Sequence, residues 1–130
     1  MTVVLLDTHA LLWALTEPKR LSVRARKTLA DPRVELLVSA ATGWEIATKS
    51  RLGKLAGAEA IVLAYDSYLA HLGVRELPIT SRHATAAGAL TWAHRDPFDR
   101  MLAAQAMLES VPLATADKAF AGCPGVRVLW

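Results

Sequence analysis

The sequence predicts an α/β protein, a three-layer α/β/α domain built around a central parallel sheet of about five strands. Short apolar runs alternate along the chain with longer amphipathic stretches, and parallel neighbouring strands need such crossover connections. The chain has 130 residues, of which 53% are hydrophobic, enough to bury a sizeable core. We therefore expect residues 1–130 to form a single domain.

The N-terminal part predicts a strand and two helices. Val3–Leu6 is a short continuous apolar run that ends at Asp7, which is typical of a buried strand. A helix is expected over His9–Leu15. A second helix is expected from a cap at Ser22 to about Ala30.

The middle of the chain repeats this alternation. After the Asp31-Pro32 turn, Val34–Ser39 predicts a second strand, and the stretch TGWEIATKSRL predicts a helix. Residues Ala58–Leu72 predict one helix, which ends at Gly73.

The C-terminal part predicts three more strands and two helices. Val74–Leu77 is a short strand, and Thr80 is placed to cap a helix through Trp92. The remaining elements are a helix over Pro97–Glu109 and strands over Pro112–Thr115 and Val126–Leu129.

Composition restricts the function classes. A formal net charge of +3 permits a polyanionic partner without requiring one, and the basic clusters Lys19–Lys27 and Lys49–Lys54 are each more typical of solvated helix faces. One cysteine, Cys123, suits a reducing compartment, so we expect a cytoplasmic protein. Glu59 and Asp66 interrupt the longest apolar stretch, and no membrane segment is expected.

Four carboxylates fall where parallel strands and their helices bring side chains together. Asp7 follows the first strand, Asp117 follows the strand PLAT, and Asp99 opens the helix that leads into that strand. Each acid also has a simple structural explanation: Asp7 and Asp117 suit helix caps, and Glu45 lies one helical turn before Lys49. Taken singly, none indicates catalysis.

Taken together, the acids favour a cation site. Asp99 shares a helical face with Leu102, Ala103 and Ala106, so it should point inward. Carboxylates that converge at a partly buried edge repel by on the order of 3 kcal/mol per pair at about 5 Å and an effective dielectric of about 20. A hard cation, Mg²⁺ or Mn²⁺, would relieve this repulsion, and the shortage of cysteine and clustered histidine argues against zinc.

The segment HRDPFDR, residues 94–100, contains two candidate aspartates. Asp96 directly precedes Pro97 and is expected to be the helix N-cap, whereas Asp99 is expected to be the ligand. The reverse assignment stays open because helix starts read from sequence are uncertain by a few residues. His9 and His94 are near neighbours of the acids, and we expect them to be surface or substrate-contacting residues. Trp13, Trp44 and Trp92 are expected to be core or interface anchors.

Four segments resemble the acidic blocks of PIN-domain ribonucleases, specifically the VapC-type toxins of prokaryotic toxin–antitoxin pairs. They are LLDTHALLWAL, GWEIATKSRLGKL, DPFDRMLAAQA and LATADKAF, and the resemblance covers essentially the whole chain. It implies an α/β/α PIN fold with Asp7, Glu45, Asp99 and Asp117 as the acidic site. Thr115 matches the hydroxyl residue often found near the last aspartate. At His9 many relatives carry a small polar residue, which leaves the role of His9 open.

The resemblance further implies an Mg²⁺-dependent endoribonuclease, a homodimer, and inhibition by a cognate VapB-like antitoxin. Water as the nucleophile would leave 5′-phosphate and 3′-hydroxyl ends. Lys49, Arg51, Arg100 and Lys118 lie near the acids in sequence and are candidates for holding the RNA backbone, although each is equally explained as a solvated charge.

Two other functions stay open. A PIN module that binds RNA or protein without cleaving it would keep the fold without the activity. A phosphoacceptor signalling domain has a similar size and fold class, but it ordinarily carries a pair of acids after the first strand, where this chain has only Asp7.

Overall fold

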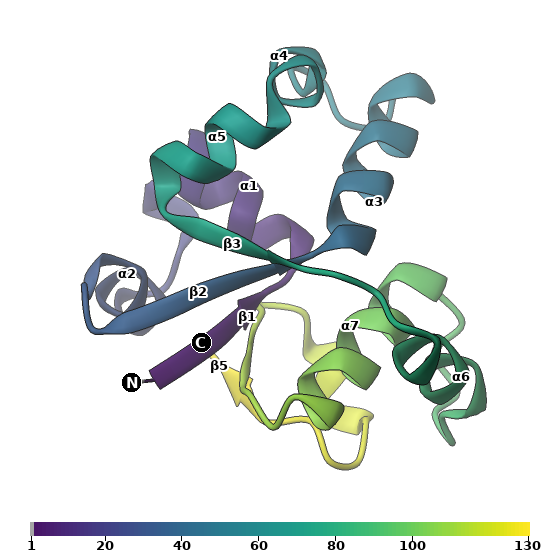
Figure 1. Ribbon diagram of the computed structural model, residues 1–130. Coiled ribbons are helices and arrows are strands. Elements are labelled where there is room, and N and C mark those ends of the chain that lie inside the picture. Colours follow the sequence, from purple (N-terminus) through teal and green to yellow (C-terminus); the bar gives the residue numbers. More distant parts are fainter. Residues whose placement is uncertain (1) are drawn as a thin grey trace.

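The computed structural model describes residues 2–130; Met1, the first residue of the expected domain, lies outside the described residues. The described chain forms a five-stranded, all-parallel sheet in the order β3-β2-β1-β4-β5 (Figure 1). Helices cover both faces, which confirms the predicted three-layer α/β/α architecture. The strands are β1 (Thr2–Leu6), β2 (Val34–Ser39), β3 (Val74–Leu77), β4 (Leu113–Ala114) and β5 (Val128–Leu129).

Strand β1 lies at the centre of the sheet and separates two hydrophobic clusters. It pairs with β2 on one side and β4 on the other, with Leu6 opposite Val38 and Ala114. Alternate side chains of a strand point to opposite faces, so Leu6 packs in one cluster and Leu5 in the other, both fully buried. Both faces of this strand are covered, which is why a continuous apolar run, without polar alternation, predicts it.

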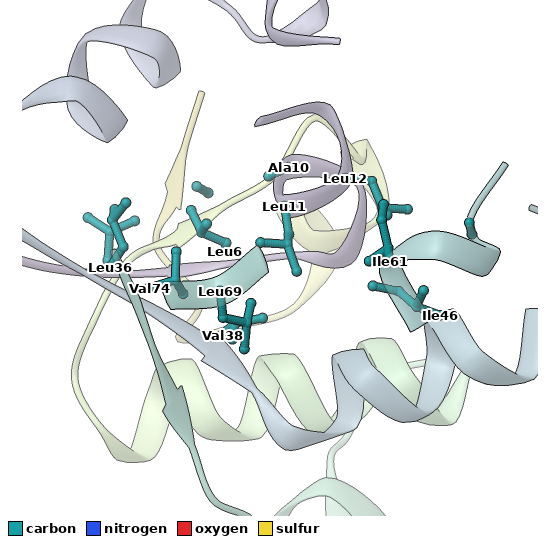
Figure 2. Packing of buried hydrophobic residues seen from close by; sticks show 13 residues of the cluster. Leu6, Ala10, Leu11, Leu12, Leu36, Val38, Ile46, Ile61, Leu69 and Val74 are labelled. Carbon is teal, nitrogen blue, oxygen red and sulfur yellow. The ribbon is translucent and has the colours of Figure 1, made fainter. Parts of the chain in front are cut away.

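The helices divide between the two faces. Helices α1, α3, α4 and α5 contribute Leu11, Ile46, Ile61 and Leu69 to the cluster shown in Figure 2. Helix α7 and the short helix η2 cover the other face. The α-helices are α1 (Thr8–Thr16), α2 (Val23–Ala30), α3 (Ala40–Arg51), α4 (Glu59–Leu63), α5 (Tyr65–Leu72), α6 (Ser81–Ala89) and α7 (Pro97–Leu108), and the 3₁₀ helices are η1 (Pro18–Arg20) and η2 (Lys118–Gly122).

The predicted helix boundaries are confirmed where a capping side chain sets them. The Ser22 hydroxyl accepts a hydrogen bond from the Ala25 N–H at 3.0 Å and begins α2. Thr80 caps α6 in the same way, and Gly73 ends α5 with a left-handed φ of 74°.

Two predicted helices differ from the structure. The helix expected over Ala58–Leu72 is two helices, because the backbone turns at Ala64, where φ is −127° and ψ is 37°. The helix expected to run to Trp92 ends at Ala89. Its last carbonyl groups, and those just beyond it, are bound by a distant arginine, described below.

The two C-terminal strands are shorter than predicted. β4 spans Leu113–Ala114 within the expected Pro112–Thr115, although Thr115 still donates its N–H to the Leu129 carbonyl at 3.3 Å. The strand expected to begin at Val126 begins at Val128, because the Val126 N–H donates to the Cys123 carbonyl in a turn instead of to the sheet.

No helix within residues 2–130 is long and apolar enough to cross a membrane.

Candidate functional site

Five acidic side chains line one pocket of about 130 Å³, and four of them are the acids that the sequence predicts as ligands. These four are Asp7 after β1, Glu45 in α3, Asp99 at the start of α7 and Asp117 before η2. Thr8, His9, Lys49 and Asp96 complete the lining. The structure therefore brings together all four acids that the sequence analysis singled out.

Asp7 caps a helix and also lines the acidic pocket. One carboxylate oxygen accepts the Ala10 N–H at 2.7 Å and caps α1, while the other accepts the Thr115 hydroxyl at 2.5 Å. Burial raises the pKa of the Asp7 carboxyl above its usual value, and the hydrogen bond from Thr115 only partly offsets this. Its side chain is thus fixed in a place where negative charge is poorly solvated.

Glu45 is almost fully buried, with 3% of its surface exposed. Its carboxylate accepts the Thr8 hydroxyl at 2.5 Å and pairs with Lys49 one turn along α3. Burial opposes the charge of Lys49, but the hydrogen bond and charge of Glu45 outweigh it and hold the pKa of Lys49 above its usual value. Thr8 is a site residue that the sequence analysis missed, although its position directly after Asp7 was a signal.

Asp96 is the N-cap of α7, as predicted, and the role of Asp99 as a cation ligand stays a prediction. Asp96 caps α7 by accepting the N–H groups of Phe98 and Asp99 at 2.9 and 3.2 Å. The Asp99 side chain is 18% exposed and lies 2.7 Å from the His94 ring. Burial, together with the charges of Asp96 and Glu45, raises the pKa of Asp99 to about 6 against the opposing effect of His94.

Asp117 is exposed and joins the site through Thr115. Its carboxylate accepts the Ala119 N–H at 2.9 Å and so caps η2, while its own N–H donates to the Thr115 hydroxyl at 3.0 Å. The buried Thr115 hydroxyl therefore connects the backbone at Asp117 to the carboxylate of Asp7.

The donor set fits a hard divalent cation. Within residues 2–130, no three Asp, Glu, His or Cys side chains already form a cage around one point. Lys49 instead pairs with Glu45, and the His94 ring contacts Asp99. A bound cation would compensate the negative charge of the same carboxylates. The four acids supply only oxygen ligands, which Mg²⁺ and Mn²⁺ prefer.

Arg100 differs from the expectation that it holds RNA. Its five guanidinium N–H groups donate to the backbone carbonyls of Ala87, Gly88, Leu90, Trp92 and His94 at 2.8 to 3.4 Å. All of its donors are therefore used within the protein. Residue types do not reveal this structural role, because every residue has a backbone carbonyl and the acceptors lie in a preceding segment.

The other three basic candidates occupy different surroundings. Lys49 lines the acidic pocket but is paired with Glu45. Arg51 and Lys118 are exposed. None of these positions identifies an RNA contact by itself.

Of the two expectations for Trp44, a core or an interface anchor, the core one is wrong because 62% of its surface is exposed, and the interface one stays a prediction. Its ring meets Phe98 edge to face, with centroids 4.7 Å apart. The two rings line an apolar pocket of about 210 Å³ that also contains Ile79 and Met101. Glu45, the next residue of α3, points instead into the protein.

Comparisons with known proteins agree with this architecture. Residues 4–125 match the PIN domain family. The chain is 37% identical over 123 residues to Ribonuclease VapC22 of Mycobacterium tuberculosis, covering 91% of this chain and 89% of the relative.

Two solved structures share the fold. VapBC2 from Rickettsia felis, bound to a DNA fragment from its promoter, gives a TM-score of 0.73 at 15% identity over 98% of this chain and 97% of the other. VapBC-5 from Mycobacterium tuberculosis, a member of the VapBC family of toxin–antitoxin systems, gives 0.63 at 20% identity over 98% of each chain.

Proposed function

Because this chain belongs to the PIN domain family and is of the VapC type, we propose that it is a divalent-cation-dependent endoribonuclease, the toxin of a toxin–antitoxin pair. The observation that carries the proposal is the convergence of Asp7, Glu45, Asp99 and Asp117 on one pocket. The chain's mild positive charge suits a polyanionic substrate, and we place the activity in the cytoplasm.

The chain's own residues would position both the cation and the substrate. Asp7, Glu45, Asp99 and Asp117 would hold the cation, with Thr115 fixing Asp7 and Thr8 fixing Glu45. A bound Mg²⁺ or Mn²⁺ ion supplies positive charge against the phosphate oxygens and lowers the pKa of a water molecule. Water would attack the phosphorus opposite the 3′ oxygen, so that the P–O3′ bond breaks and the products carry a 5′-phosphate and a 3′-hydroxyl.

The experiment is a cleavage assay on structured RNA with purified protein freed of any inhibitor. Cleavage should require Mg²⁺ or Mn²⁺ and stop when EDTA is added, and the mapped ends should carry 5′-phosphates. Undiminished cleavage in EDTA, or 2′,3′-cyclic phosphate ends, would contradict the proposed chemistry. If the protein binds RNA but does not cleave it with any cation, the result would favour a binding module instead.

We propose a VapB-like antitoxin as the partner that silences this site. An inserted arginine or lysine of the partner would take the place of the cation among the acids. Apolar side chains of the partner would pack on the pocket beside α1 that Leu12, Trp13 and Ile61 line. We expect such a partner segment to be disordered alone and to fold on this surface.

We propose that the chain forms a homodimer through the face that carries Trp44. An exposed tryptophan beside the partly exposed Ile79 and an apolar pocket is typical of a surface that another protein covers. Light scattering should report a dimer for the wild type and a larger monomer fraction for Trp44→Ser. Unchanged dimerisation in that variant would place the interface elsewhere.

A further inference from the structure

A second pocket, of about 370 Å³, opens from the acidic residues toward the basic cluster Lys19–Lys27. Asp7 and Asp117 line it together with Ala116 at one side, and His9, Trp13 and Arg20 complete the lining. The pocket is therefore continuous with the proposed catalytic site. Its other wall contains the guanidinium group of Arg20, for which the proposed chemistry has no role.

Arg20 is held in place by an aromatic platform. Its guanidinium carbon lies 4.6 Å from the centroid of the Trp13 ring, and Trp13 in turn contacts His9 and Trp130 with ring centroids 5.7 and 5.9 Å apart. Arg20 follows α1 directly on the 3₁₀ helix η1, so the turn after α1 brings it back over Trp13. Cation–π contact orients the planar group before any ligand arrives.

The donors of Arg20 remain available to a ligand. Its side chain is 56% exposed, and its ion pair with Glu17 has an N–O distance of 3.8 Å, longer than a good hydrogen bond. Among the described residues that line the two pockets containing Asp7 and Asp117, Lys49 and Arg20 are the lysine and arginine side chains, and Lys49 is already paired with Glu45. Arg20 is thus the cation at this wall that can still bind a phosphate.

We propose that Arg20, seated on Trp13, binds a backbone phosphate of the RNA that flanks the one being cleaved. This inference rests on the proposed ribonuclease function and extends it to a substrate-binding residue. A fixed guanidinium donates two parallel hydrogen bonds to phosphate oxygens and offsets the repulsion that the acids exert on a polyanion. Contacts to phosphate fix the position of a nucleic acid strand without reading its sequence.

RNA binding measured by fluorescence anisotropy tests the proposal. The protein carries Asp99→Asn to prevent cleavage, the probe is a short single-stranded RNA of mixed sequence, and the titration is repeated in Mg²⁺ over a range of KCl concentrations. Arg20→Gln should weaken binding by about tenfold and lower the slope of log affinity against log salt by about 0.7, the loss of one phosphate contact. Arg20→Lys should keep the slope and lose part of the affinity, because lysine lacks the fork.

Lys19→Gln is the matched control, since it removes the same charge from the same short helix outside the pocket. It should change the affinity by less than about twofold. If Arg20→Gln and Lys19→Gln weaken RNA binding equally, Arg20 contributes only non-specific positive charge, and the proposal is overturned. Unchanged RNA affinity in Arg20→Gln would also overturn it. Weaker binding of that variant to the candidate antitoxin, the product of the gene adjacent to this one, would assign Arg20 to the protein partner.

The proposed function is judged separately in the same experiment. If the protein with Arg20 intact binds RNA and the wild type cleaves it, the ribonuclease proposal stands whatever Arg20→Gln does. If the protein with Arg20 intact binds no RNA, both proposals fail.

Discussion

Four of the five acids of the pocket have their geometry fixed by a local partner that also stabilises the fold. Asp7, Asp96 and Asp117 accept helical N–H groups, and Glu45 pairs along its own helix. Capping holds a carboxylate in a single orientation, which is useful to a residue that must meet a cation in a defined position. At this scale, stability and function depend on the same hydrogen bonds.

Asn substitutions separate the two aspartates of HRDPFDR. Asp99→Asn should lower cleavage by at least about 100-fold with the fold intact, because it removes a ligand charge and keeps the side-chain shape. Asp96→Asn should leave cleavage and stability nearly unchanged, within about 0.5 kcal/mol, because asparagine caps a helix as well as aspartate does. RNA cleavage and thermal unfolding of both variants are the measurements, and exchanged phenotypes would reverse the assignment.

Protons and the cation should compete at Asp99. Its pKa is about 6 in the folded protein and 3.8 in the reference state, so between these values the folded state holds more protons. The contribution of Asp99 to the stability of the metal-free protein therefore falls as the pH rises through this window. Binding of Mg²⁺ needs the ionised form and becomes stronger over the same range.

Thermal unfolding with and without MgCl₂ measures this competition. The increase in Tm caused by MgCl₂ should be clearly larger at about pH 7.5 than at about pH 5, on either side of the Asp99 pKa. Asp99→Asn should lose most of that difference. An equal increase at both pH values in the wild type would exclude Asp99 as a ligand of the ion.

At the scale of secondary-structure elements, the connection between α6 and α7 is held by one side chain, that of Arg100. Arg100 lies in the first turn of α7 and binds the carbonyls that follow the end of α6, including that of His94. The carbonyls of Ala87 and Gly88 lie in the last turn of α6, where a helix leaves its carbonyls unpaired, and the others belong to the loop. The next helix therefore holds the loop that carries Asp96, which lines the pocket, and His94, which contacts Asp99.

Arg100→Lys should destabilise the protein by about 2–4 kcal/mol, because an ammonium group cannot reach carbonyls arranged around a flat fork. Urea unfolding measures the change. Arg95→Lys, an exposed position in the same loop, is the matched control and should stay within about 0.5 kcal/mol of the wild type. Similar midpoints for the two variants would show that the arginine network is dispensable.

Local signals explain which elements could be predicted. Ser22, Thr80 and Asp96 set their helix starts through their own side chains, and the strands Val34–Ser39 and Val74–Leu77 have the predicted bounds. The break at Ala64 carries no glycine or proline signal. The early end of α6 depends on Arg100, a contact that no local pattern contains.

The same distinction holds for the site. The positions of Asp7, Glu45, Asp99 and Asp117 follow from strand ends and helix faces, which periodicity reveals. The contacts of Arg20 with Trp13 and of His94 with Asp99 depend on turn geometry that residue spacing does not determine. Trp44 is exposed for another reason: its neighbour Glu45 occupies the buried side of the helix.

At the scale of the whole molecule, the substrate and the antitoxin should exclude each other. His9, Trp13 and Arg20 line both the pocket that opens from the acids and the pocket beside α1. A partner anchored on Trp13 therefore also covers the route along which we place the RNA.

A competition titration of the adjacent gene product against labelled RNA should show displacement from the Asp99→Asn protein. Trp13→Ala should weaken binding of that product by about tenfold or more, since a buried tryptophan is a common hot spot. Asp7→Asn should weaken it through the lost contact with an inserted basic residue. Simultaneous binding of both ligands, or unchanged affinity in both variants, would contradict this placement.

The central position of β1 determines when the acidic pocket of a newly synthesised chain can assemble. Thr115, whose hydroxyl binds the Asp7 carboxylate, follows Asp7 by 108 residues in the chain, and Asp117 comes two residues later. Since chains are synthesised from the N-terminus, the growing polypeptide lacks an assembled pocket until β4 can join the sheet beside β1. If this pocket is the active site, a growing chain that does not yet contain Thr115 and Asp117 should not cleave RNA, and an inhibitor would have that interval to bind.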